Sequence, residues 1–276
     1  MSFIPCKICG NTTSGFLPQF ELLKCNTCGF IFFKNPLSET YVKELYDKLY
    51  NQQEDYAAYK MQADQLMQGK QAPIGYDKTV VLNKLLEKGC SNFAEIGAGV
   101  GIVGKYLESK QLKYEGIELD HQAATLAAKA GVNVKNGSFQ QLESIKNKDC
   151  IVAFEVIEHI EDLKECLQMI NHSLKSNGYF GFTVPNFQKY YNQSKEKQKT
   201  RLDQVGPPVH INFFTIENIS EILPLFGFKI VYLKVRPFPS LNFNRKITYI
   251  RLLKSLIGKY HGPNILCIAK KIKEAV

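Results

Sequence analysis

The chain has 276 residues, of which 45% are hydrophobic, and a formal net charge of +9. This length and apolar content exclude a wholly disordered chain and predict one large domain with an appendage, or two modest domains. No run of about 18 apolar residues occurs, so the sequence predicts no membrane span. The opening MSFIPCKICG lacks the pattern of a secretory signal, and we expect a cytoplasmic protein. The basic balance fits nucleic acid, an anionic membrane surface or a phosphorylated small molecule, and equally a plain lysine-rich surface.

Four of the eight cysteines form two closely spaced pairs, which are Cys6-x-x-Cys9 and Cys25-x-x-Cys28. A glycine follows each pair and permits a tight turn, and four thiolates satisfy the tetrahedral preference of zinc with no open position. The spacing predicts a structural zinc ribbon over residues 1–35, with an iron–sulfur cluster or redox dithiols as alternatives. The other cysteines stand at unrelated spacings. Cys150 and Cys267 lie in apolar runs, which indicates buried free thiols.

Helical and strand patterns follow the ribbon in chain order. Apolar and aromatic residues recur at helical spacing over residues 38–70, which predicts a helical linker or cap over 36–75. Helices are then predicted over 76–89, 100–111, 121–131, 161–178 and 215–227, and strands over 92–99, 114–120, 133–139, 149–156, 178–186, 227–235 and 263–272. Apolar strands that alternate with amphipathic helices indicate a doubly wound, mostly parallel α/β sheet over 76–276, with a polar lid insertion at 187–209.

The first strand of that domain runs into a glycine-rich loop that contains Glu95, Gly97, Gly99 and Gly101. Glycine lets the backbone turn tightly and approach a ligand, and the helix that follows offers free N–H groups. The next strand ends at Glu118, where a carboxylate can accept hydrogen bonds from a ribose diol. Alternatively, Glu118 and Asp120 only cap the next helix. The G-x-G-x-G spacing, together with the acid before it, favours S-adenosylmethionine (SAM) over a dinucleotide.

Two later segments carry acids and histidines. Glu155, Glu158 and His159 follow the fourth strand, and a helical turn there would bring them to one side. In the simpler interpretation, the acids favour a helix N-terminus, and His159 packs or forms a hydrogen bond. A separate catalytic hypothesis makes His159 a proton acceptor. His210 lies in PPVHINFFT, with Thr215 expected to cap the next helix. Histidine suits general-base catalysis near neutral pH. The alternative is that His210 orders its loop by hydrogen bonding.

Residues 90–165 resemble a class I SAM-dependent methyltransferase of the ubiquinone-biosynthesis-like O-methyltransferase group. The resemblance implies that the methionine part of SAM is surrounded by Glu95, Gly97, Gly99 and Gly101. It also implies that Glu118 holds the ribose and that Leu119 packs on the adenine. The family's Gly-Asp after the third strand is replaced here by Gly-Ser-Phe, so Ser138 is expected to hydrogen-bond and Phe139 to stack at the adenine.

The same resemblance concerns the methyl-transfer centre. It places Glu155 beside the methyl group of SAM, and it allows a divalent metal at Glu155, Glu158 and His159 that polarises an acceptor hydroxyl. PPVHINFFT is similar to the family's PPxHxxxFT stretch, which places His210 at the mouth of the acceptor pocket.

The ribbon, the tyrosine-rich helical segment and the core together resemble bacterial sugar and surface-polysaccharide methyltransferases. The longer C-terminal region of sugar C-methyltransferases is missing, which favours O- or N-methylation. The family suggests that tyrosines of the helical segment close over SAM, although core packing is an equal alternative; they are Tyr46, Tyr50, Tyr56 and Tyr59. Basic residues of the lid either meet a diphosphate or form a solvated face.

We therefore expect SAM-dependent O-methylation of a sugar, a nucleotide-linked sugar or a surface-glycan intermediate, as in capsule polysaccharide biosynthesis. The expected cofactors are SAM and a structural Zn²⁺, and we expect a small carbohydrate acceptor and no nucleic-acid partner. Two alternatives stay open. The first is an RNA methyltransferase that uses the ribbon to bind its substrate. The second is a non-catalytic SAM-binding partner protein.

Overall fold

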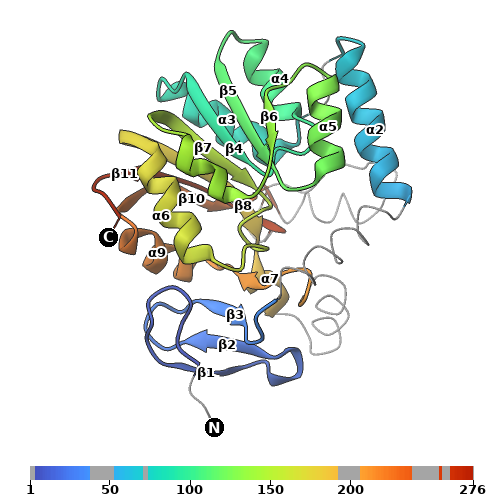
Figure 1. Ribbon diagram of the computed structural model, residues 1–276. Coiled ribbons are helices and arrows are strands. Elements are labelled where there is room, and N and C mark those ends of the chain that lie inside the picture. Colours follow the sequence, from blue (N-terminus) through green and yellow to red (C-terminus); the bar gives the residue numbers. More distant parts are fainter. Residues whose placement is uncertain are drawn as a thin grey trace.

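The computed structural model describes residues 4–37, 53–70, 74–191, 206–237, 255–256 and 262–275. Its N-terminal part is a small antiparallel sheet of β1 (Thr13–Phe16), β2 (Leu22–Cys25) and β3 (Ile31–Phe33), with a 3₁₀ turn η1 (Pro18–Phe20) between the first two strands. A fourth strand, β9 (Asn212–Phe213), joins this sheet from the other end of the chain. Figure 1 shows the small sheet, in blue, against the orange segment that contains β9.

The central sheet has seven strands in the order β10-β11-β8-β7-β4-β5-β6. Their bounds are β4 (Asn92–Ile96), β5 (Lys113–Glu118), β6 (Val134–Asn136), β7 (Lys148–Phe154), β8 (Leu174–Pro185), β10 (Phe228–Val235) and β11 (Asn264–Lys271). Strand β11 is antiparallel to both of its neighbours, whereas the strands from β8 to β6 pair in parallel. The predicted doubly wound, mostly parallel sheet is confirmed.

Helices cover both faces of this sheet (Figure 1). Their bounds are α2 (Gln53–Met67), α3 (Tyr76–Glu87), α4 (Ile102–Glu108), α5 (His121–Lys129), α6 (Leu163–Ser173), α7 (Phe187–Tyr191) and α9 (Ile216–Leu225), with a 3₁₀ segment η2 (Phe139–Ser144). One hydrophobic cluster joins α6 and α9 to one face, and a second joins α3, α4 and α5 to the other. Helix α2 packs outside this layer, against α5 and α4.

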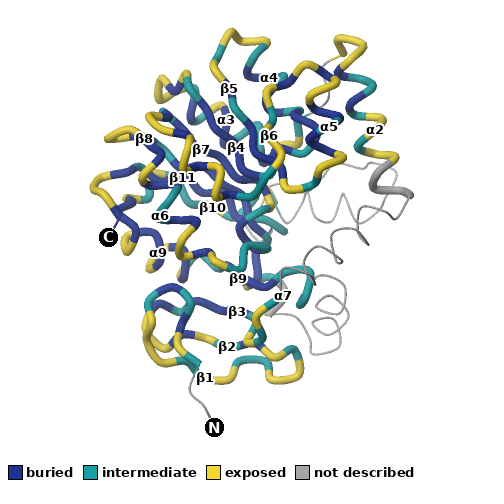
Figure 2. The backbone as a smooth tube through the Cα atoms, viewed as in Figure 1, coloured by how far each residue is buried: buried dark blue, intermediate teal, exposed yellow. Residues whose placement is uncertain are grey.

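Strand β7 explains why the central strands are apolar throughout. Successive side chains point to opposite faces of a sheet, so Ile151 and Ala153 pack toward α6 while Cys150 and Val152 pack toward α3. Both faces are covered, and each of these side chains is fully buried. Figure 2 shows the buried centre of the sheet beneath exposed helix surfaces.

Two expectations about this domain are wrong. The predicted helix over 161–178 ends at Ser173, and the chain enters β8 at Leu174, because pairing with β7 begins at Leu174 and overrides the helical pattern. Cys150 is not a free thiol, since it forms a disulfide with Cys90 across 60 residues of sequence. Cys267 is free and buried, as predicted.

Some expectations lie outside the described residues, namely residues 38–52, with Tyr46 and Tyr50, and most of the polar lid, 192–205. Where the structure describes the lid, it begins as the short helix α7. No helix among the described residues is long and apolar enough to cross a membrane.

Candidate functional site

The glycine-rich loop links β4 to α4 at the carboxyl end of the central strands. Gly97, Gly99 and Gly101 all have positive φ angles, of 73°, 54° and 82°. A Cβ on Gly97 would lie 2.3 Å from Val156, and one on Gly101 would lie 2.7 Å from Val132. A Cβ on Gly99 would meet only the ring of Tyr59, at 3.6 Å. Packing therefore explains the outer two glycines, whereas Gly99 faces space that a ligand can use.

Glu118 holds this loop in place from the end of β5. Its Oε2 accepts a hydrogen bond from the backbone N–H of Gly99 at 2.7 Å, and its Oε1 accepts one from Asp120 at 2.8 Å. Burial raises the pKa of this carboxyl, and the two backbone N–H groups partly oppose the rise. Capping of α5 falls to Asp120, whose side chain accepts from the N–H of Ala123. Glu118 is thus positioned at the loop and is not the cap of the next helix.

Glu95 is fully buried beneath the glycine-rich loop. Its Oε2 accepts a hydrogen bond from the hydroxyl of Tyr114 at 2.6 Å, whereas its Oε1 is buried with no hydrogen-bond partner among the described residues. Burial raises the pKa of Glu95 to about 7. An unsatisfied buried carboxylate oxygen favours a positively charged or hydrogen-bonding ligand group.

Lys78 lies near the Glu95 carboxyl, and sequence reasoning did not single it out. It lies in the first turn of α3, and its ammonium is 5.3 Å from the ring centroid of Phe154. Its charge lowers the pKa of both Glu95 and Glu155, so it faces the same region as these carboxyls. A lysine on an amphipathic helix has the sequence pattern of a solvated surface residue, and nothing local distinguishes it.

Three residues are expected at the adenine, and they differ in their exposure and in their contacts: Leu119, Ser138 and Phe139. The Leu119 side chain is 49% exposed next to Glu118, as a packing surface for a base requires. The Ser138 hydroxyl donates to the side chain of Gln140. Phe139 is buried in the main hydrophobic cluster with Ile117. The roles of Ser138 and Phe139 in binding adenine stay predictions.

The segment after β7 is a non-helical turn. The prediction that Glu155, Glu158 and His159 share one side depended on a helical turn there. Glu155 has a positive φ of 59°, which is rare for a residue with a side chain. The side chain reaches solvent, yet the protein around it raises its pKa to about 7, mainly by desolvation. Glu158 points inward instead. It is 1% exposed, and neither of its carboxylate oxygens has a hydrogen-bond partner among the described residues.

His159 and His210 lie together beside Glu158. Their ring centroids are 4.8 Å apart with an edge-to-face arrangement. The Nδ1 of His159 is 2.7 Å from the carbonyl of Val209, which can only accept, so Nδ1 carries the proton and Nε2 is the basic atom. That Nε2 lies 4.0 Å from Glu158 Oε1. Burial lowers the pKa of His159, which favours the neutral ring.

These three side chains form a group that could hold a metal ion, since one ligand atom from each lies within 4.8 Å of the others. The predicted set was Glu155, Glu158 and His159. The structure brings His210 into the group in place of Glu155, because the turn is not helical and the PPVHINFFT segment packs against it.

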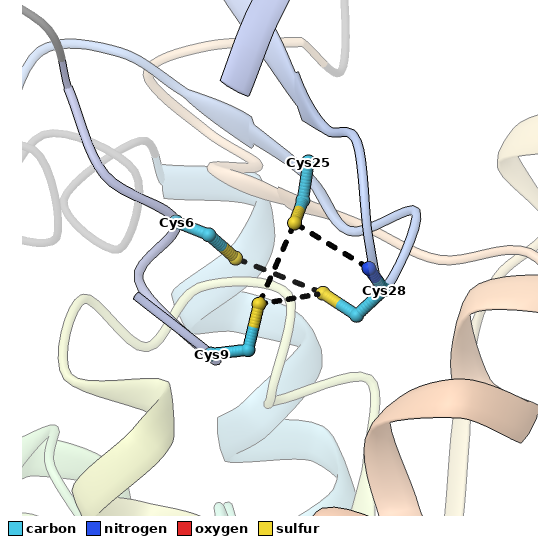
Figure 3. Close-up of side chains that lie close together, drawn as sticks. All are labelled: Cys6, Cys9, Cys25 and Cys28. Atoms are coloured by element: carbon cyan, nitrogen blue, oxygen red, sulfur yellow. Dashed lines mark hydrogen bonds between the residues drawn. The ribbon is translucent and has the colours of Figure 1, made fainter. Parts of the chain in front are cut away.

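The four N-terminal cysteines converge on one point (Figure 3). Their Sγ atoms lie 3.7 Å apart for Cys6 and Cys28, 3.5 Å for Cys9 and Cys25, and 3.6 Å for Cys9 and Cys28. Tetrahedral zinc with Zn–S bonds of about 2.3 Å requires sulfur separations of about 3.8 Å. Backbone N–H groups point at two of the sulfurs: that of Ile8 at Cys6, and that of Thr27 at Cys25. The cluster therefore fits a zinc ribbon.

Comparisons with known proteins agree with this fold. Residues 73–233 match a family model described as a methyltransferase domain. The chain is 25% identical over 154 residues to a malonyl-[acyl-carrier protein] O-methyltransferase from Calditerrivibrio nitroreducens, an alignment that covers 54% of this chain and 58% of that protein. The chain thus matches less than two thirds of that relative.

Two solved structures share the fold at low identity. A SAM-dependent methyltransferase from Archaeoglobus fulgidus is 19% identical, with a TM-score of 0.50 over 71% of this chain and 95% of that one. One from Mesorhizobium loti is 13% identical, with a TM-score of 0.52 over 71% and 98%. Because the family model covers more than half of the chain, the chain belongs to the methyltransferase-domain family.

Proposed function

We propose that this enzyme transfers the methyl group of SAM to a hydroxyl oxygen of a small carbohydrate acceptor, which is a sugar, a nucleotide-linked sugar or a surface-glycan intermediate. The observation that carries the proposal is the pair of imidazoles, His159 and His210, beside the turn after β7. A hydroxyl oxygen has to lose its proton as it attacks, and a neutral imidazole accepts a proton near neutral pH.

The binding roles follow from the carboxyl ends of β4 and β5. Glu95 takes the ammonium of the methionine part with Oε1, for which the described residues offer no partner, and Lys78 takes the carboxylate. Glu118 takes the ribose, and the exposed Leu119 covers the adenine. SAM supplies an electrophilic methyl group on a sulfonium.

The acceptor oxygen forms a bond to the methyl carbon as the carbon–sulfur bond breaks, and the electron pair of that bond neutralises the sulfonium. The hydroxyl proton passes to His210. His159, held by the carbonyl of Val209, stands beside the acceptor with its own basic nitrogen. The two rings orient the acceptor, His210 receives its proton, and alignment alone supplies much of the rate in such a displacement.

A divalent metal at Glu158, His159 and His210 is a second way to activate the hydroxyl. The buried Glu158 carboxylate, neither of whose oxygens has a hydrogen-bond partner in the described part of the chain, fits a cation. Metal analysis separates the two. If a histidine acts as the base, metal analysis should find one tightly bound metal per chain, at the cysteines. A second metal that is lost in His210→Gln supports the metal-assisted route.

A carboxyl acceptor is the competing class, because the relative from Calditerrivibrio nitroreducens is named for O-methylation of a malonyl group on a carrier protein. A carboxylate carries no proton at neutral pH. An enzyme for that acceptor has no use for a base, and the two histidines favour the hydroxyl.

Methyl transfer from tritiated SAM to a panel of acceptors tests the proposal. The panel contains nucleotide sugars, free monosaccharides, malonyl-carrier protein and total tRNA. We expect labelling of a nucleotide sugar or a sugar, reduced about 100-fold or more in His210→Gln, since general-base catalysis contributes on the order of 10²–10⁴-fold. Labelling of only the carrier protein or of tRNA, unaffected by His210→Gln, would reject it.

A further inference from the structure

The zinc-ribbon sheet extends directly into the segment that carries His210. Strand β3 pairs with β9, with Ile31 opposite Phe213 and Phe32 opposite Asn212. The backbone N–H of Phe33 also donates to the carbonyl of Ile211 at 2.8 Å. The ribbon is thus hydrogen-bonded to the residues that immediately follow His210, more than 170 residues later in the chain.

Asn212 ties the same segment to the turn after β7. The backbone N–H groups of Ile211 and Asn212 both donate to the carbonyl of Glu158, each at 3.0 Å. The side-chain Nδ2 of Asn212 donates to the carbonyls of Ile157, at 2.9 Å, and Ile160, at 2.6 Å. Asn212 is 1% exposed. One buried amide therefore holds carbonyls on both sides of Glu158 and His159.

Further contacts between the ribbon and this region reinforce the link. Lys7, within the first cysteine pair, forms an ion pair with Glu161 just after the turn. The Phe30 ring lies 6.0 Å from that of Phe214. Cys6 and Cys28 are buried in the same hydrophobic cluster as Ile157. The position of the cysteine cluster is thus coupled to the position of the turn.

We propose that the zinc-loaded ribbon and Asn212 form one positioning unit for His159 and His210; this inference rests on the function proposed above. Zinc fixes the ends of β2 and β3, β3 aligns β9, and Asn212 transmits that alignment to the turn. The SAM side is held separately, by Glu118 at Gly99. The ribbon therefore controls the acceptor side of the site and not the binding of SAM. A misplacement of about 1 Å in such a site costs about 100-fold in rate.

The test compares two buried asparagines in the full-length, zinc-loaded protein. Asn212→Ala removes the bridge to the turn. Asn171→Ala is the matched control, because the Nδ2 of Asn171 also donates to two backbone carbonyls, of Phe226 at 2.8 Å and Lys273 at 3.0 Å, away from the histidines. Asn212→Ser, which retains one possible donor, replaces the alanine variant if that does not fold.

Two readouts need no acceptor. Titration calorimetry gives the affinity for SAM, and NMR of labelled histidine gives the Hε1 signals of both rings and the Nδ1–H proton that His159 donates to Val209. In Asn212→Ala we expect an unchanged SAM affinity, within about twofold, displaced Hε1 signals and a lost Nδ1–H signal. Removal of zinc with a mercurial and a chelator should produce the same changes. Asn171→Ala should produce none of them.

Unchanged histidine signals in Asn212→Ala overturn the bridging role of Asn212. Unchanged histidine signals in the zinc-free protein overturn the role of zinc. Parallel loss of SAM affinity overturns it too, since the effect is then global. With an acceptor that is turned over, kcat of Asn212→Ala should fall at least tenfold while KM for SAM stays within about twofold. A third outcome is that the histidine signals are displaced in Asn212→Ala, while the wild-type enzyme methylates none of the acceptors. That outcome would reject the proposed function but would still support the positioning unit.

Discussion

At the scale of single residues, Glu95 is the group whose chemistry depends most directly on the occupancy of the site. It is wholly buried, one oxygen is held by Tyr114, and the other has no partner among the described residues. Ionisation of a carboxyl in that position is unfavourable when the site is empty and favourable when a cation lies beside the carboxylate. If Glu95 binds SAM as proposed, SAM binding and ionisation of Glu95 are therefore linked.

The linkage has a definite sign. Burial raises the pKa of Glu95 from 4.5 to about 7, so its contribution to folding stability is complete below pH 4.5 and is lost as the pH rises through 7. SAM affinity changes in the opposite direction, because the methionine ammonium prefers the ionised carboxylate. We expect the affinity for SAM to rise with pH up to about pH 7, by at most about tenfold per pH unit. Calorimetry in buffers of different ionisation enthalpy should detect proton release.

Glu155 has a pKa of about 7 as well, so the assignment needs a control. Glu95→Gln should flatten the pH dependence of SAM affinity, whereas Glu155→Gln should leave most of it. A pH-independent affinity in the wild-type enzyme would contradict the role given to Glu95.

At the scale of elements, α2 is the helix whose attachment bears most directly on the cofactor site. Its contact runs through Ala63, which is fully buried against Val100, Ala123 and Leu126. Tyr59, one turn earlier, lies over Gly99. Since Val100 belongs to the glycine-rich loop, docking of α2 and the shape of that loop depend on each other.

Ala63→Glu should detach α2 by placing a charge in this contact. We expect SAM affinity to fall at least about tenfold while the central sheet stays folded, because a buried unpaired charge costs several kcal/mol. Met61→Glu is the control, since Met61 lies on the same helix with its side chain 58% exposed. Calorimetry and hydrogen exchange of α2 measure the outcome. Equal affinities in the two variants would show that α2 does not support the loop.

At the scale of the whole molecule, the ribbon and the methyltransferase domain share one core. Cys6, Cys25 and Cys28 belong to the hydrophobic cluster that also contains Leu167 of α6 and Ile219 of α9. We expect a single cooperative unfolding transition in scanning calorimetry, and we expect removal of zinc to lower its Tm as a whole by several degrees. A separate low-temperature transition for the ribbon would contradict this expectation.

The sequence predicted the local elements better than the contacts between distant ones. The glycine-rich loop, the strand that ends at Glu118 and the capping Thr215, whose side chain accepts from Asn218, all follow from short-range patterns. The location of Lys78, the Cys90–Cys150 bond and the group of Glu158 with His210 depend on chain segments that meet only in the folded state. The spacing of residues along the chain does not predict these contacts between distant segments.

Strand β9 also limits how this enzyme can be recombined with its relatives. The ribbon looks like a detachable N-terminal module, yet its fourth strand is encoded more than 170 residues downstream. A chimera that exchanges residues 4–37 alone would set a foreign β3 against the native β9. The unit of exchange is discontinuous, residues 4–37 together with 206–214, and a change of ribbon brings with it a change of the segment that carries His210.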